Sequence, residues 1–152
     1  MSLRAYEASD LPALVALERD AFADDAWSAD ALAELVATEG RRLVVEERDG
    51  AVVGYVLTGL AGDFVDLLRI AVTPTARRGG VASRVLDAAV QAAAGDGADR
   101  MLLEVSEANT GAHAFYLRHG FAEIDRRAGY YRDGSTALVM MRELPTPERM
   151  DP

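Results

Sequence analysis

The stretch Arg77–Ala82, which reads Arg-Arg-Gly-Gly-Val-Ala, separates an expected β-strand from a strongly amphipathic helix. The strand is expected over about Phe64 to Val72, and the pair Thr73-Pro74 ends it. Small residues at a helix start let backbone N–H groups come close to an anion, and the helix dipole adds about half a positive charge there. The stretch therefore predicts a turn that binds phosphate groups.

Two arginines, Arg77 and Arg78, lie in this stretch and Arg84 follows it, in a chain that is otherwise acidic. A flexible loop with solvated arginines would explain the same residues, because glycine pairs are common in loops. Two other phosphate-binding motifs are excluded. The Gly-Lys-Ser/Thr ending of a Walker loop is missing, and no Gly-x-Gly-x-x-Gly opens the helix as in dinucleotide-binding proteins.

Three helices are indicated by apolar residues at helical spacing. Asp10 is a candidate N-cap for the first helix, and Ser28 is one for the second, which Gly40 is expected to stop. The residues of the first helix that occur at helical spacing are Leu11, Leu14, Val15, Glu18, Ala21 and Phe22. The helix after the phosphate turn carries Val81, Val85, Leu86, Ala89, Val90 and Ala93 on one face.

Strands are indicated by β-rich runs over Leu43–Glu47 and Ala51–Thr58, joined through Asp49-Gly50, a strong two-residue hairpin signal. Alternating side chains predict another strand over Met101–Ser106. The remaining expected elements are a helix from about Asn109 to His119 and strands near Phe121–Arg127 and Ala137–Arg142. This order implies an α/β fold with a mixed sheet and helices on both faces.

Length and composition set the broad class. The 152 residues correspond to one domain, expected over residues 1–144, followed by a frayed tail at residues 145–152. The chain has no cysteine, which excludes disulfide and thiolate-zinc scaffolds. It has no apolar run of the roughly 20 residues needed to span a bilayer, and its first residues do not form a signal peptide. No membrane association and a cytoplasmic location are therefore expected.

The charge is lopsided, with 25 acidic residues against 16 basic ones and a net charge of -9. All 16 basic residues are arginine. A GC-rich genome explains this usage, and so does adaptation to salt, in which a negative surface keeps a protein dispersed. No nucleic-acid partner is expected in either case, because binding to phosphates without sequence preference needs an excess of basic residues.

The spacing Arg77-x-x-Gly80-x-Ala82 fits the Gln/Arg-x-x-Gly-x-Gly/Ala motif of the GCN5-related N-acetyltransferase (GNAT) superfamily, which the chain resembles over nearly its whole length. Within that superfamily it is most similar to the bacterial ribosomal-protein-alanine N-acetyltransferases (RimI-like). Four further segments carry the resemblance: Leu68–Pro74, Leu103–Val105 with Asn109, Ala114–Phe121, and Arg126-Arg127 with Tyr130-Tyr131. The resemblance implies the GNAT fold, a mixed and mostly antiparallel sheet with a splayed acetyl-CoA cleft.

Acetyl-CoA is the co-substrate that the resemblance implies, and no metal is expected. Backbone groups of the strand end would hold the pantetheine arm, the Gly-rich turn would hold the pyrophosphate, and Asn109 would hydrogen-bond the pantetheine. The residues assigned in this way are Ile70, Ala71, Val72, Arg77, Arg78, Gly79, Gly80, Val81, Ala82, Ser83 and Asn109.

Similarity to the ribosomal-protein branch points to Glu104 as general base and Tyr116 as general acid. Acetyl transfer to an amine needs a base for the amine proton and an acid for the departing thiolate. A carboxylate partly removed from water on the strand Met101–Ser106 would have a raised pKa. Alternatively, Glu104 lies on a solvated face or pairs with an arginine. Tyr116 follows Asn109 by two helical turns, and of the neighbouring aromatic residues Phe115 is the better core candidate.

The acceptor side is expected to include Trp27, Tyr130 and Tyr131. Two segments depart from the ribosomal-protein branch: Ala26-Trp27-Ser28 replaces its Pro-Trp-Ser, and Ser135-Thr136 replaces acidic residues before the last strand. The leading hypothesis is acetyl transfer to the N-terminal α-amine of a protein or peptide, such as a ribosomal protein. The alternatives are a small-molecule amine or amino-acid acetyltransferase and a non-catalytic acyl-CoA sensor. A monomer and a homodimer are both compatible with the sequence.

Overall fold

The computed structural model describes residues 2–77 and 79–145 of the chain. The chain divides into two units. The first comprises Met1–Leu60 and Leu67–Ala92, and the second comprises Ala61–Asp66 and Ala93–Pro152. Arg78 and most of the expected tail, residues 146–152, lie outside the described residues.

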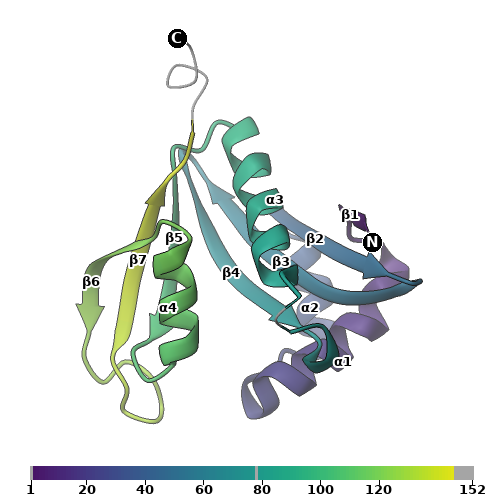
Figure 1. Cartoon of the computed structure of the whole chain (residues 1–152), viewed down its shortest axis with the longest axis horizontal. Helices are drawn as coiled ribbons and strands as arrows, with labels where there is room; N and C mark the ends of the chain where they lie inside the picture. The colour runs from purple at the N-terminus through teal and green to yellow at the C-terminus, as the bar shows by residue number, and fades with distance from the viewer. Residues whose placement is uncertain (1, 78, 146–152) are drawn as a thin grey trace. The chain divides into compact units, whose positions relative to one another are not determined.

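Four strands and three helices make up most of the first unit (Figure 1). They are β1 (Ser2–Ala5), α1 (Leu11–Phe22), α2 (Ala29–Ala37), β2 (Arg41–Arg48), β3 (Ala51–Ala61), β4 (Phe64–Val72) and α3 (Val81–Gly95), with short 3-10 turns at Ala8–Asp10, Ala23–Asp25 and Pro74–Ala76. The second unit contains β5 (Arg100–Ser106), α4 (Thr110–Arg118), β6 (Ala122–Arg127) and β7 (Ala137–Glu143).

The strands pair in the order β1-β2-β3-β4-β5-β7-β6. Pairing is antiparallel between β1 and β2, β2 and β3, β5 and β7, and β6 and β7. It is parallel between β4 and β5, where the register covers Phe64–Asp66 and Arg100–Leu102. The prediction of a mixed, mostly antiparallel sheet is confirmed.

The β2–β3 hairpin forms where the sequence predicts it. Asp49 and Gly50 both have positive φ, 53° and 80°, as a two-residue hairpin turn of the primed type requires. The strands are longer than predicted, because β2 begins at Arg41 and β3 continues to Ala61. The short strand β1 was not predicted, since its residues Ser2–Ala5 are mostly exposed and carry no apolar alternation.

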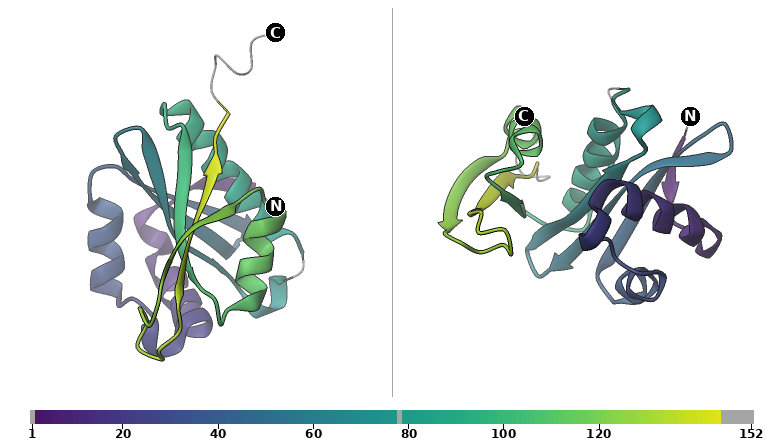
Figure 2. Two further views of the ribbon diagram at one scale, coloured as in Figure 1. Left: turned by 90° about the vertical axis from the view of Figure 1, so that its left-hand side faces the viewer. Right: turned by 90° about the horizontal axis from the view of Figure 1, so that it is seen from below.

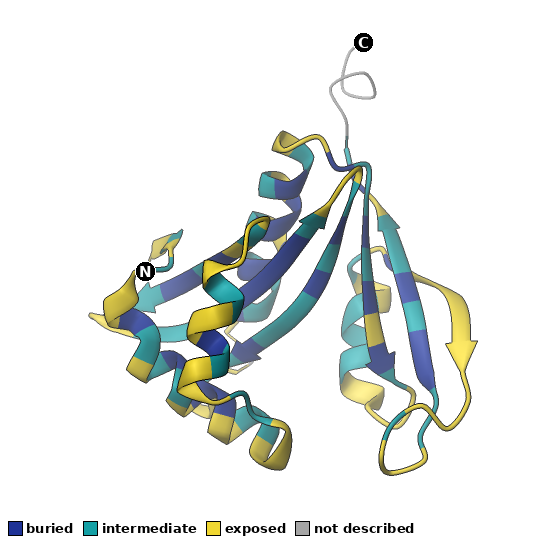
Figure 3. Ribbon diagram, turned by 180° about the vertical axis from the view of Figure 1, so that it is seen from behind, coloured by how far each residue is buried: buried dark blue, intermediate teal, exposed yellow. Residues whose placement is uncertain are grey.

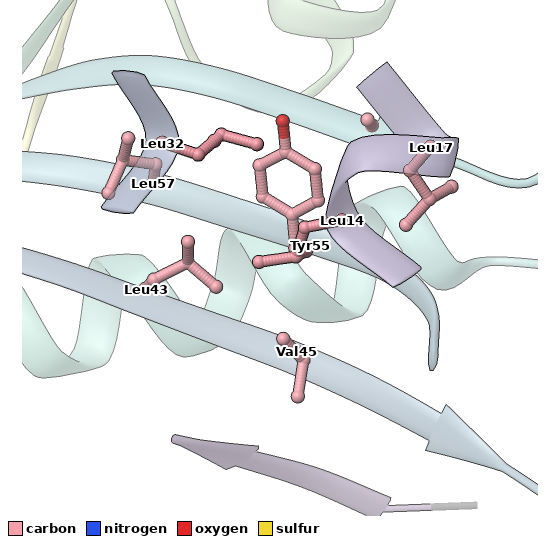
Figure 4. Packing of buried hydrophobic residues seen from close by; sticks show 8 residues of the cluster. Leu14, Leu17, Leu32, Leu43, Val45, Tyr55 and Leu57 are labelled. Carbon is pink, nitrogen blue, oxygen red and sulfur yellow. The ribbon is translucent and has the colours of Figure 1, made fainter. Parts of the chain in front are cut away.

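The core of the first unit lies between the helix pair α1–α2 and one face of the sheet. Leu14, Leu17 and Leu32 of these helices pack on Leu43, Val45, Tyr55 and Leu57 of the strands (Figure 4). The opposite face of β3 meets α3 so closely that a Cβ added at Gly54 would lie 2.6 Å from Val81 Cγ1. Helices therefore cover both faces of the sheet within this unit, as predicted (Figure 2).

The expected helix caps are confirmed in part. Ser28 is the N-cap of α2, and its hydroxyl accepts the Ala31 N–H at 3.1 Å. The carboxylate of Asp10 makes no capping bond to α1, and it instead accepts the Glu7 N–H and pairs with Arg4. Gly40 was expected to end α2, but the helix ends at Ala37, three residues earlier.

In the second unit, α4 lies along one face of the strands β5, β7 and β6 (Figure 2). The buried residues of β7, including Leu138 and Met140, alternate with less buried ones. All six residues of the edge strand β6 are exposed, and its register shifts between Glu123 and Asp125 where it pairs with β7 (Figure 3).

Candidate active site

The phosphate turn leads directly into α3, which begins at Val81. Gly80 has a φ of 81°, a conformation that side chains with a Cβ rarely adopt. A Cβ at Gly80 would also come within 2.9 Å of the Arg84 Nη1 atom. The first turn of a helix leaves its backbone N–H groups without intrahelical partners, so the start of α3 offers donors to an anion.

A buried carboxylate lies behind this turn. Glu46 on β2 is fully buried, and it receives hydrogen bonds from Arg84 Nε at 2.7 Å and Arg84 Nη2 at 3.0 Å. Arg48 Nη2 contacts the same carboxylate at 3.2 Å. Two arginines therefore share one negative charge beside the turn. The positive charge expected from Arg84 is partly neutralised, and its guanidinium is held in place.

The buried carboxylates of Glu46 and Asp10 lead us to expect that the protein loses stability in acid. The hydrogen bonds from Arg84 hold the pKa of the Glu46 carboxyl below its usual value, and Arg4 does the same for the pKa of Asp10. Because both folded-state pKa values are lowered, the stabilisation is fully present above the ordinary pKa of about 4. It is lost as the pH falls through the lowered values. Urea unfolding between pH 7 and pH 3 should show this decline, and Glu46→Gln should make it shallower. Equal slopes for both proteins would contradict the assignment to Glu46.

The end of β4, where the sequence predicts contacts to a pantetheine arm, leads into the phosphate turn. The parallel pairing with β5 covers only Phe64–Asp66, at the start of the strand, so Ile70–Val72 lie beyond the residues it pairs. The Val72 carbonyl accepts a hydrogen bond from Arg77 Nε at 3.3 Å. Beside it, the Thr73 hydroxyl is buried, and the described residues offer it no hydrogen-bond partner. A polar ligand group at this position would satisfy it.

Glu104 lies on β5 in the second unit with its side chain 38% exposed. Its carboxylate pairs with Arg127 Nη1 of β6 at 3.3 Å. The side chain is thus partly accessible to solvent, and the pairing with an arginine that the sequence also allows is observed. Tyr131 lies close enough for the Glu104 charge to help raise the pKa of its phenol, although burial is the larger cause.

Tyr116 is positioned by the packing of α4 on the chain that follows it. Its ring meets the buried Phe121 edge-on at 5.5 Å between centroids. Burial raises the pKa of the Tyr116 phenol to about 12, so the hydroxyl keeps its proton at neutral pH. Phe115, expected in the core, is only partly buried, and its ring packs on His119 at 4.2 Å. Tyr116 is also partly buried, and its ring lies against Phe121 while that of Phe115 lies against His119.

Asn109 is the N-cap of α4 rather than a residue within the helix. Its side-chain oxygen accepts the Ala112 N–H at 3.1 Å. Because Asn109 precedes the regular helix, its spacing of seven residues from Tyr116 does not by itself place both side chains on one helix face. The capping bond does fix the direction of the Asn109 side chain, with the oxygen toward the helix.

Tyr130 and Tyr131 lie in the segment between β6 and β7. Their rings meet edge-on at 5.2 Å between centroids, and Tyr130 is 53% exposed. A turn closed by the Gly134 N–H bond to the Tyr131 carbonyl follows them. The structure thus brings Tyr130, Tyr131, Glu104 and Arg127 together within the second unit.

Trp27 lies in the first unit, in the connector between α1 and α2. Its ring stacks on the Arg69 guanidinium of β4, 4.0 Å from the ring centroid. Its backbone N–H bonds to the buried carboxylate of Glu18 at 2.9 Å. Glu18 occurs at helical spacing with the apolar residues of α1, but no pattern in the sequence indicates Arg69 as its partner.

The model of the acetyltransferase (GNAT) family matches residues 5–121. The chain belongs to the GNAT family. An N-alpha-acetyltransferase of Saccharolobus solfataricus is 31% identical over 109 residues, which span 63% of this chain and 65% of the length of that protein. The crystal structure of a ribosomal-protein alanine N-acetyltransferase from Escherichia coli superposes with a TM-score of 0.87 at 28% identity, covering 95% of this chain and 94% of that one.

This GNAT protein is an N-acetyltransferase, and acetyl-CoA is the donor that acetyltransferases of this fold use. An aminoglycoside 6'-N-acetyltransferase solved with coenzyme A shares the fold at a TM-score of 0.85 and 14% identity, covering 97% of this chain and 99% of that one. Within the described ranges, no group of three or more His, Asp or Glu side chains is arranged to hold a metal ion. None of the helices in those ranges has the length and apolar character needed to cross a membrane.

Proposed function

We propose that this GNAT enzyme transfers the acetyl group of acetyl-CoA to the N-terminal α-amine of a protein or peptide. Binding of acetyl-CoA is supported by the Gly80 turn at the start of α3, where a Cβ cannot be accommodated without displacing Arg84. Support for the acceptor half comes from relatives named N-alpha-acetyltransferase and ribosomal-protein alanine N-acetyltransferase. Ribosomal proteins are therefore candidate acceptors.

In the proposed binding mode, the stretch Arg77–Ala82 holds the pyrophosphate through backbone N–H groups, and Ser83 in the first turn of α3 contributes to the same site. The strand residues Ile70–Val72 hold the pantetheine arm through their backbone. Asn109 contributes its amide N–H donors, since its oxygen serves the helix cap. Acetyl-CoA supplies the activated thioester when bound.

The proposed reaction is direct transfer. The neutral amine nitrogen attacks the thioester carbonyl carbon, a C–N bond forms and the C–S bond breaks. Glu104 takes one proton from the amine, directly or through a water molecule, and Tyr116 gives one proton to the departing thiolate. The products are the N-acetylated acceptor and the free thiol of coenzyme A. The high pKa of Tyr116 keeps the donating form populated at neutral pH.

The α-amine is the easier acceptor for a single carboxylate base. An α-amine has a pKa of about 7.7–8.0 and a lysine side chain one of about 10.4. Near pH 7, reaching the neutral amine therefore costs about 1 kcal/mol for the α-amine and about 4.6 kcal/mol for lysine. Trp27 in the first unit and Tyr130 and Tyr131 in the second are the aromatic residues proposed to contact the acceptor.

The experiment compares two peptides of one sequence that begins with Ala or Ser. One peptide has a free N-terminus and a blocked lysine, and the other has the reverse. Thiol release should be faster with the first peptide, and a peptide blocked at both sites measures background hydrolysis. Faster release with the lysine peptide would overturn the acceptor class and leave the acetyl-CoA site intact. A small amine that reacts faster than either peptide would favour the small-molecule alternative.

A further inference from the structure

A second buried carboxylate, Glu18 of α1, takes no part in the proposed chemistry. It is fully buried and accepts four hydrogen bonds from three other elements. Arg69 donates from Nε at 3.2 Å and from Nη2 at 2.9 Å, and the Tyr55 hydroxyl also donates to the carboxylate. The fourth donor is the backbone N–H of Trp27 at 2.9 Å.

Arg69 extends this network into the connector between α1 and α2, residues 23–28. The Arg69 guanidinium lies between two aromatic rings, 3.8 Å from the centroid of Phe22 and 4.0 Å from that of Trp27. Its Nη2 atom also donates to the Asp25 carbonyl at 2.7 Å. One arginine therefore contacts the residue before the connector and two residues within it. The planar guanidinium of arginine provides several N–H donors in fixed directions and also stacks on aromatic rings, and the ammonium group of lysine does not.

The connector has a backbone conformation that needs external support. Ala23 has a φ of 47° and a ψ of −112°, which a residue with a Cβ rarely adopts. A strained residue of this kind persists when the surrounding contacts hold it, and such residues cluster at functional sites. The side chains of Asp24 and Asp25 are exposed, so burial of the connector's own side chains does not hold this conformation. The contacts that hold it are those made by Glu18 and Arg69.

We propose that Glu18 and Arg69 form a clamp that positions Trp27 and the connector for binding of the acceptor amine. The proposal rests on the proposed function, in which Trp27 lines the acceptor side. Arg69 directly precedes Ile70 on β4, so the clamp ties the connector to the strand proposed to hold the pantetheine arm. Glu18 and Arg69 are positioning residues, and the clamp determines affinity for the acceptor rather than for acetyl-CoA.

Trp27 is the only tryptophan of the chain, so its fluorescence reports on the connector without any label. The test compares the wild type with Arg69→Met and with the double variant Glu18→Gln/Arg69→Met. The double variant leaves no uncompensated charge in the buried site, which keeps a folded protein available. Arg4→Met is the matched control, because it breaks two other ion pairs of the first unit, those of Arg4 with Asp10 and with Glu47.

Quenching of Trp27 fluorescence by acrylamide should increase in both clamp variants and stay unchanged in Arg4→Met. The KM for the acceptor should rise about tenfold or more, as expected when a binding wall loses its position. The affinity for acetyl-CoA, measured by calorimetry, should stay within about twofold, because the phosphate turn keeps its contacts. A purely structural role would lower the melting temperature without this separation of acceptor KM from acetyl-CoA affinity.

The outcomes separate this proposal from the proposed function. If peptides fail as acceptors but a small amine is acetylated, the peptide function is wrong, and the clamp is then judged by the KM for that amine. Unchanged Trp27 quenching together with an unchanged acceptor KM in a folded clamp variant would overturn the clamp. An equal rise of the acceptor KM in Arg4→Met would overturn it as well.

Discussion

Replacing Tyr116 with phenylalanine is expected to lower kcat about 100-fold while leaving acetyl-CoA binding unchanged. General acid catalysis contributes about that factor or more when proton transfer to the leaving group limits the rate. The substitution removes one oxygen and keeps the ring, so the edge-on contact with Phe121 and the packing of α4 are preserved. Steady-state kinetics and calorimetry on the same preparation measure the two quantities.

The raised pKa of Tyr116, about 12, adds a pH criterion. The phenol stays protonated well below that value, so ionisation of Tyr116 should not reduce kcat between about pH 7 and 10. Tyr6→Phe is the matched control, because it removes the hydroxyl of a partly buried tyrosine of the first unit that has no proposed role. Wild-type turnover in Tyr116→Phe would remove this residue from the mechanism.

Replacing Gly80 with valine is expected to weaken acetyl-CoA binding about 100-fold, or about 2.7 kcal/mol. A β-branched residue at a φ of 81° is strained, and its Cβ would press on Arg84 Nη1. The side chain would also occupy the space through which the backbone N–H groups reach the pyrophosphate. Calorimetric titration with acetyl-CoA measures the loss.

Gly95→Val provides the control for this substitution. Gly95 lies at the end of α3, where an added Cβ meets nothing within 4 Å. The control should therefore bind acetyl-CoA as the wild type does. If Gly80→Val is folded by circular dichroism and binds with unchanged affinity, the pyrophosphate does not lie at this turn.

Structural features that depend only on neighbouring residues could be predicted from the sequence. The Asp49-Gly50 hairpin, the Ser28 cap and the start of α3 at Val81 each depend on the conformational preference of one or two residues. Such preferences act locally, so they are visible before any tertiary contact is known. The family motif around Gly80 is also a local feature, because it is defined by the spacing of residues within one short segment.

The ion pairs could not be predicted, because they join residues far apart in the sequence. Arg84 lies 38 positions from Glu46, and Arg69 lies 51 positions from Glu18. Glu18 shares its helical spacing with the apolar residues of α1 and is buried with them, but periodicity does not indicate which cation compensates a buried charge. The sequence does not identify the partner of Glu104 for the same reason. Arg127 reaches Glu104 only because β5 and β6 both pair with β7.

The assignment within α4 shows another limit. Neighbouring aromatic residues on a helix must point in different directions, but the sequence does not state which one faces the protein. Phe115 was expected inside because it has no polar group. Phe115 and Tyr116 are both partly buried, and the ring of Tyr116 contacts the buried Phe121, which follows the helix.

The exposure of β6 bears on how the protein behaves at high concentration. An edge strand has unpaired backbone groups that can recruit another strand, which is a common start of aggregation. Four of the six residues of β6 are charged, Glu123, Asp125, Arg126 and Arg127, and the register shift lies among them. An approaching strand would meet charges and an irregular edge, so growth of the sheet from one molecule to the next is disfavoured on this side.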